Sequence, residues 1–86
     1  MHTVKLLEEA IGLAERIGYQ VRTEWLGGSG GGGCEFNGRK WIFLDLALGP
    51  LDQLEQVLDT LRREPEAVSL PMPHQLRELL EVRKSA

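Results

Sequence analysis

The sequence predicts an α+β domain, because the spacing of its apolar residues changes along the chain. Apolar side chains recur at helical spacing over residues 3–17, alternate with a period of two over residues 19–25, and return to helical spacing over residues 50–63. Between the strand and the second helix, Asn37-Gly38 predicts a β-hairpin, since both residue types accept the positive φ angles of a type I′ turn. The expected fold has an N-terminal helix, a small three-stranded and mostly antiparallel sheet, and two C-terminal helices.

Length and composition are those of an ordinary soluble domain. With 86 residues, of which 42% are hydrophobic and 27% charged, residues 1–86 suffice for one domain with a small core. A net charge of −3, spread over both halves, offers no cluster of cations for nucleic acid. No apolar run approaches the roughly 20 residues of a membrane span, and the N-terminal segment lacks the apolar core of a signal peptide. We therefore expect a cytoplasmic protein that binds neither nucleic acid nor membrane.

The first helix and the first strand follow from the pattern of the N-terminal segment. Thr3 is expected to cap the helix, and Gly18 stands where a helix commonly ends in a left-handed residue. Gly12 lies inside the helix, where glycine costs roughly 1 kcal/mol relative to alanine. In residues 19–25, Tyr, Val, Thr and Trp alternate with polar residues, which predicts a strand with one buried face.

The second arm of the hairpin, residues 41–46, is apolar on both faces. A strand of this kind is usually central in its sheet or covered twice, which favours the strand order 1-3-2. A simple meander would instead place the second strand in the middle. If a chain this short covers only one face of its sheet, some of Trp25, Trp41 and Phe43 are left for another subunit.

The C-terminal part of the chain is expected to be helical. Proline at position 50 suits the first residue of a helix, and Arg62 and Arg63 suit its negative end. Pro65 is expected to end this helix. A linker then leads to Pro73 and a short last helix.

Residues 27–33 hold six glycines and one serine between two predicted strands. A phosphate-binding loop needs a lysine and a hydroxyl after the glycines, but Cys34 and Glu35 follow here. The dinucleotide pattern matches by letter, yet it must open a helix, and a strand follows instead. We therefore expect residues 27–33 to be a flexible glycine-rich loop and expect no nucleotide cofactor.

Few residues suggest chemistry. Cys34 has no histidine at a spacing that would activate its thiol, because His2 and His74 stand near opposite ends. The favoured interpretation of Cys34 is a buried thiol that packs as a small apolar side chain. Cys34 and the two histidines also do not supply a zinc tetrad. We expect no catalytic residue, no metal and no cofactor. Asp45 ends the doubly apolar strand, and we expect its carboxylate to accept amide hydrogen bonds from the turn that follows.

One stretch resembles known proteins. Residues 33–58, GCEFNGRKWIFLDLALGPLDQLEQVL, resemble a group of small bacterial proteins that share the glycines, the cysteine, the Gly-basic turn, the strand ending in Asp and the Pro-started helix. The stretch is also distantly similar to zincin-like metallopeptidases of the ImmA/IrrE type, in which such a strand leads into the helix bearing H-E-x-x-H. The resemblance implies that scaffold. Residues 57–64, VLDTLRRE, contain no histidine, so it implies neither a zinc site nor peptidase activity here.

The sequence favours a non-enzymatic protein–protein interaction or homodimerisation module. The candidate interface or ligand contacts are Trp25, Cys34, Trp41, Phe43 and Asp45. The alternative is a small-molecule-binding or enzymatic domain in which residues 27–33 close as a lid near Cys34 and Asp45. A third hypothesis is a peptidase-derived regulatory fragment that takes up no zinc.

Overall fold

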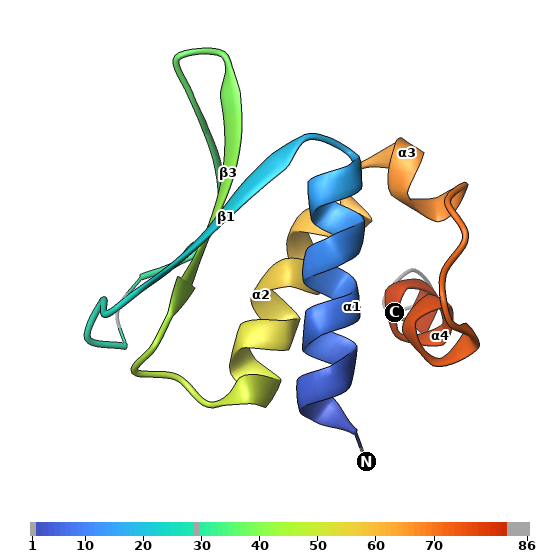
Figure 1. The fold of residues 1–86 in the computed structure, drawn as a ribbon, viewed down its shortest axis with the longest axis horizontal. Coiled ribbons are helices and arrows are strands. Elements are labelled where there is room, and N and C mark those ends of the chain that lie inside the picture. The colour runs from blue at the N-terminus through green and yellow to red at the C-terminus, as the bar shows by residue number, and fades with distance from the viewer. Residues whose placement is uncertain (1, 29, 83–86) are drawn as a thin grey trace.

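The computed structural model describes residues 2–28 and 30–82 and confirms an α+β fold (Figure 1). Helices α1 and α2 pack against each other and against the same face of a three-stranded sheet. In chain order, the elements are α1 (Thr3–Arg16), β1 (Tyr19–Glu24), β2 (Gly32–Phe36), β3 (Arg39–Asp45), α2 (Pro50–Arg62), α3 (Pro65–Val68) and α4 (His74–Val82).

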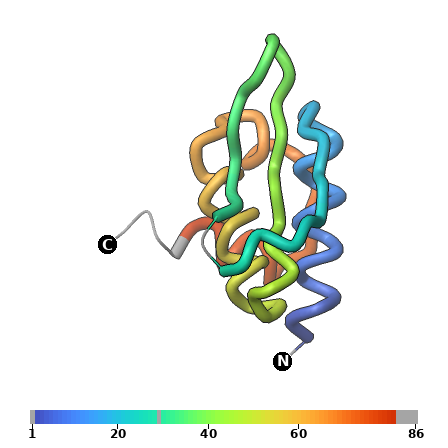
Figure 2. The backbone as a smooth tube through the Cα atoms, turned by 90° about the vertical axis from the view of Figure 1, so that its left-hand side faces the viewer, coloured from blue at the N-terminus to red at the C-terminus, as the bar shows by residue number. Residues whose placement is uncertain are grey.

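The sheet is mixed, whereas a mostly antiparallel sheet was expected. Its strand order is β1-β3-β2 (Figure 2). The strand that is apolar on both faces is therefore central, which confirms the predicted order 1-3-2. β3 runs parallel to β1 and antiparallel to β2. The parallel pair arises because the chain after β1 crosses the carboxyl end of β3, where the amides of Leu26 and Gly28 bond Asp45, before β2 runs back. Sequence spacing alone does not show that the chain takes this path.

The hairpin between β2 and β3 turns at the predicted residues. Asn37 has a φ of 54° and Gly38 a φ of 75°, which are the positive values that a type I′ turn requires. Phe36 and Arg39 are the paired residues next to the turn. The tip of this hairpin extends beyond the helices (Figure 1).

The sequence predicted the C-terminal end of α1 correctly but not its N-terminal cap. Gly18 follows the helix with a φ of 103°, as a left-handed residue after a helix should. Thr3 is the first helical residue rather than the cap, and His2, which precedes it, makes no capping side-chain hydrogen bond. The expected Thr3 cap is therefore wrong by one position.

The C-terminal segment holds one more helix than expected. α2 begins at Pro50 as predicted, but Pro65, expected only to end a helix, also begins the four-residue helix α3.

Two arginines attach the last helix, α4, to α2 and to the segment around α3. Arg62 donates a hydrogen bond to the carbonyl of Leu79 at 2.8 Å, and Arg77 donates one to the carbonyl of Val68 at 2.9 Å.

The hydrophobic core lies between the helices and the side of the sheet that they cover. Its buried residues come from α1, β3, α2, α3 and α4. They are Leu6, Leu7, Ala10, Leu13, Ala14, Ile42, Leu44, Leu54, Val57, Leu58, Leu61, Ala67, Leu76 and Leu80. Ile42 and Leu44 are thus the half of β3 that meets the core, and alternation turns Trp41 and Phe43 to the other side.

Candidate functional site

The face of the sheet opposite the helices carries the apolar residues that the core leaves uncovered. We call this surface the open face and define it by Arg22, Cys34, Phe36, Trp41 and Phe43. Strand pairing places these residues together, because Arg22 is level with Phe43 and Cys34 is level with Trp41. In Figure 2 the sheet lies in front of the helices, so this face is turned toward the viewer.

Aromatic rings dominate the open face. The rings of Trp41 and Phe43 stack with their centroids 5.9 Å apart and an angle of 12° between their planes. Phe36, on the neighbouring strand, is 67% exposed. The open face and Glu35 line a shallow depression of about 540 Å³. Trp41 and Phe43 are half-buried. An aromatic cluster that is partly exposed and has charged residues at its border is typical of a protein–protein contact.

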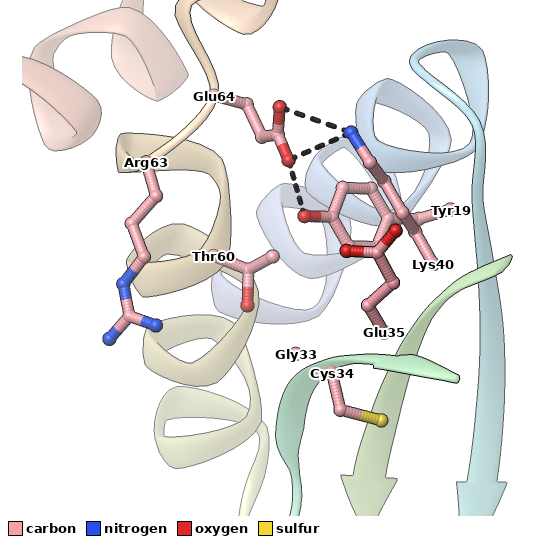
Figure 3. Close-up of a pocket in the computed structure, with 8 residues that line it drawn as sticks. All are labelled: Tyr19, Gly33, Cys34, Glu35, Lys40, Thr60, Arg63 and Glu64. Atoms are coloured by element: carbon pink, nitrogen blue, oxygen red, sulfur yellow. Dashed lines mark hydrogen bonds and ion pairs between the residues drawn. The ribbon is translucent and has the colours of Figure 1, made fainter. Parts of the chain in front are cut away.

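Cys34 lies on the open face beside Trp41. It is a free and exposed cysteine, although a small buried side chain was the favoured interpretation of the sequence. Its side chain points away from the helix side of the sheet, where Tyr19 and Glu64 lie (Figure 3). On this face it lines one depression together with Arg22 and the rings of Phe36, Trp41 and Phe43.

Asp45 is not part of the open face, because its side chain is fully buried under the residues that link β1 to β2. Its carboxylate accepts hydrogen bonds from the amides of Leu26 at 2.9 Å, Gly28 at 2.6 Å and Ala47 at 2.9 Å. The bond from Ala47 confirms the expected contact with the following turn. The bonds from residues 26 and 28 were not foreseen, and they attach the glycine-rich segment to the end of β3.

These bonds determine the charge state of Asp45. Burial of the carboxyl group acts to raise its pKa, but backbone hydrogen bonds from Ala47, Leu26, Gly28 and Gly30 outweigh that effect. The net result is a pKa below the ordinary value of 3.8. Asp45 is therefore a buried carboxylate anion at neutral pH, held by amides.

Two residues of the glycine run pack closely against α2. A Cβ at Gly33 would lie 2.6 Å from Oγ1 of Thr60, and a Cβ at Gly31 would lie 2.7 Å from Nε2 of Gln56. Gly33 belongs to β2, as does Gly32. Composition alone assigned all of residues 27–33 to a loop, because it does not separate a mobile glycine from one that permits close packing.

A polar cluster joins the sheet to the end of α2 on the helix side (Figure 3). The hydroxyl of Tyr19 donates a hydrogen bond of 2.6 Å to Glu64, and Nζ of Lys40 lies 3.2 Å from the same carboxylate oxygen. Lys40 also lies 5.6 Å from the centre of the Tyr19 ring. The cluster borders a cavity of about 180 Å³ lined by Tyr19, Gly33, Cys34, Glu35, Lys40, Thr60, Arg63 and Glu64.

The pKa values in this cluster favour one arrangement of protons. Burial raises the pKa of Tyr19 to about 12, and the hydrogen bond to Glu64 and the charge of Glu64 act in the same direction. The hydrogen bond from Tyr19, together with Lys40, holds the pKa of Glu64 below its ordinary 4.5 against the effect of burial. At neutral pH the phenol is protonated and the carboxylate charged. The cluster is therefore a tie between β1, β3 and the α2–α3 junction rather than a general base.

The structure separates the five candidate residues. Cys34, Trp41 and Phe43 come together on the open face, and Asp45 lies buried at the end of β3. Trp25 is 72% exposed just beyond the end of β1. Phe36 was missed, although it follows Cys34 by two residues and so shares its face.

Two further findings concern the described residues as a group. Among residues 2–28 and 30–82, no three His, Cys, Asp or Glu side chains gather as a metal site would require. Over the same ranges no helix is both long and apolar enough to cross a bilayer.

Comparisons with known proteins found no relative. No protein-family model matches the chain, and neither the curated proteins nor the solved structures gave a match.

Proposed function

We propose that this protein is a non-enzymatic interaction module that binds a second copy of itself through the open face and its bordering strand β2. The proposal rests mainly on the aromatic surface that Trp41, Phe43 and Phe36 form on the uncovered side of the sheet. The core of the chain is complete without these residues. Leaving them in water forgoes the free energy that burial of apolar surface releases, and a second subunit can recover it.

The geometry of the glycine-rich segment supports this proposal over a lid that closes on a ligand. The amides of Leu26 and Gly28 are bonded to Asp45, and Nε2 of Gln56 donates to the carbonyl of Gly30 at 3.2 Å. A lid would have to break these bonds in order to move. The exposed thiol of Cys34 suits a cytoplasmic location, because thiols stay reduced there.

Two variants test whether the open face carries the association. Phe36→Ser removes an exposed ring from the open face, and Leu51→Ser removes an apolar side chain of comparable exposure from the start of α2. Sedimentation equilibrium measures the dissociation constant of the dimer for each. We expect Phe36→Ser to weaken the dimer by about tenfold or more, which is about 1.4 kcal/mol, and Leu51→Ser to leave it unchanged. Equal effects of the two substitutions would contradict the proposal.

A further inference from the structure

Strand β2 is an edge of the sheet with an unpaired outer side. Phe36 and Arg39 close a two-residue hairpin, so they form a hydrogen-bonded pair, and alternation turns the backbone of Cys34 toward β3 as well. The N–H and C=O groups of Gly33 and Glu35 therefore point outward. Within the part of the chain that the structure describes, these groups have no hydrogen-bond partner. Such a row of groups is a template for another strand.

The space beside this edge is open and lined by charges of both signs. A cleft of about 260 Å³ lies between β2 and α2, lined by Gly31, Gly32, Gly33, Gln56, Asp59, Thr60 and Arg63. Asp59 and Arg63 are both exposed and stand one helical turn apart. A copy related by a two-fold axis presents them in the opposite order, so an acid of one copy can face a base of the other. The charged residues that line this cleft are therefore complementary to those of a second copy of the chain.

We infer that two copies associate by antiparallel pairing of β2 with β2, on a two-fold axis that passes between the two Cys34 residues. This inference rests on the self-association proposed above and specifies its geometry. With the axis at Cys34, the midpoint of the strand, all five residues of β2 are paired. The outward groups of Gly33 then bond those of Glu35 in the second copy. Moving the axis to Glu35 would place two carboxylates opposite each other, which destabilises a strand pair.

In this register the exposed ring of Phe36 would pack against the second copy. Phe36 falls opposite Gly32 of the second copy, and Gly32 is itself level with Phe43. Nothing lies within 4 Å of where a Cβ of Gly32 would be. The ring of Phe36 can therefore extend over this glycine toward Phe43 of the second copy, as aromatic residues do over glycines at sheet edges. The inferred dimer thus buries part of the open face of each copy.

Cross-linking through Cys34 tests the inferred axis. Opposed residues that are not hydrogen-bonded to each other have Cα atoms about 4.5 Å apart, within the range that a disulfide spans. Diamide is the oxidant: two Cys34 thiols lose two electrons and two protons to its N=N bond, which becomes a hydrazine, and an S–S bond forms. The control is Cys34→Ser with Ser69→Cys, which moves the cysteine to the exposed turn after α3.

We expect Cys34 to cross-link about tenfold faster or more than the cysteine at position 69 at equal protein concentration, because pairing raises the effective thiol concentration. Non-reducing electrophoresis against time gives the rates. If the reduced wild-type protein is a dimer but the two rates are equal, the β2 register is wrong while self-association stands. If the reduced wild-type protein is a monomer, both proposals fail.

A second pair of variants tests the backbone hydrogen bonds. Glu35→Pro removes an outward N–H that the β2–β3 ladder does not use, and Glu35→Ala keeps that N–H. With folding checked by circular dichroism, we expect Glu35→Pro to weaken the reduced dimer by about tenfold or more and Glu35→Ala to change it little. A folded Glu35→Pro variant with the dimer affinity of the wild-type protein would overturn the inferred pairing.

Discussion

The carboxylate of Asp45 accepts a hydrogen bond of 2.6 Å from the amide of Gly28, which lies 17 positions earlier in the chain. The same carboxylate holds the amides of Leu26 and Ala47. One buried side chain therefore fixes both the crossing between β1 and β2 and the turn between β3 and α2. The mixed sheet depends on this crossing.

Removing the Asp45 carboxylate should destabilise the fold. Asp45→Ala leaves the amides of Leu26, Gly28 and Ala47 without this acceptor, whereas Asp45→Asn keeps one acceptor oxygen and points an N–H group toward other donors. Both variants should therefore have a lower free energy of unfolding in urea than the wild type. Asp45→Ala should have the lowest, because it keeps no acceptor oxygen. Wild-type stability in both variants would show that these hydrogen bonds contribute nothing to folding.

The lowered pKa of Asp45 predicts how stability depends on acid. Because the folded-state pKa lies below the ordinary 3.8, the unfolded chain binds the proton more readily, and stability falls as the pH falls below about 4. The contribution of Asp45 is fully present above that range. Urea midpoints between about pH 5 and pH 2 should therefore decline more steeply for the wild type than for Asp45→Asn. Equal slopes would contradict a lowered pKa for this carboxyl group.

Tyr19 should titrate near pH 12, which can be observed directly because the chain has one tyrosine. Phenolate absorbance near 295 nm should rise with a midpoint about 2 units above the value of 10 found in denaturant. Because the raised pKa favours the protonated form in the fold, this contribution to stability is lost between pH 10 and pH 12. Glu64→Gln removes the charge that helps to raise the pKa, so its midpoint should fall. A wild-type midpoint near 10 would show that Tyr19 is not bound to Glu64.

Gly33→Ala should destabilise the protein by about 1–3 kcal/mol, because the added methyl group meets Thr60 and a packed segment must shift. Thr60→Ala removes the two nearest atoms, Oγ1 and Cγ2, and leaves Cβ at 3.3 Å. In that background the effect of Gly33→Ala should fall to about half or less, which a double-mutant cycle of unfolding free energies measures. Additive effects of the two substitutions would contradict the close packing of β2 on α2.

Gly12→Ala should raise the free energy of unfolding by about 0.5–1 kcal/mol. Gly12 lies inside α1, and no atom lies within 4 Å of where its Cβ would be. The matched control is Gly18→Ala. Gly18 also has open space, but its φ of 103° suits glycine, so alanine there should destabilise. Thermal unfolding should move the two midpoints in opposite directions, and a shift in the same direction would contradict the assigned end of α1.

Much of the fold follows from local sequence signals. Pro50, the Asn37-Gly38 turn and Gly18 each act over a few residues, and each lies where the sequence placed it. The apolar character of β3 on both faces also indicated the strand order. The parallel pairing of β1 with β3 was missed because it depends on how the chain crosses from β1 to β2, where glycines leave no pattern to interpret.

The candidate site was predictable only in part. Trp41 and Phe43 share a face through simple alternation along one strand. Tyr19, Lys40 and Glu64 come from three separate segments, so only the parallel register of Tyr19 with Lys40 brings them together. Asp45 was expected to bind the turn after it, but its contacts with residues 26 and 28 required the three-dimensional structure.

The most direct test of the central claim is the mass of the reduced wild-type protein, measured by light scattering during size-exclusion chromatography over micromolar to submillimolar concentrations. The proposed self-association predicts a mass that approaches twice the 9.6 kDa of one chain as concentration rises. A constant mass of 9.6 kDa at every concentration would contradict it.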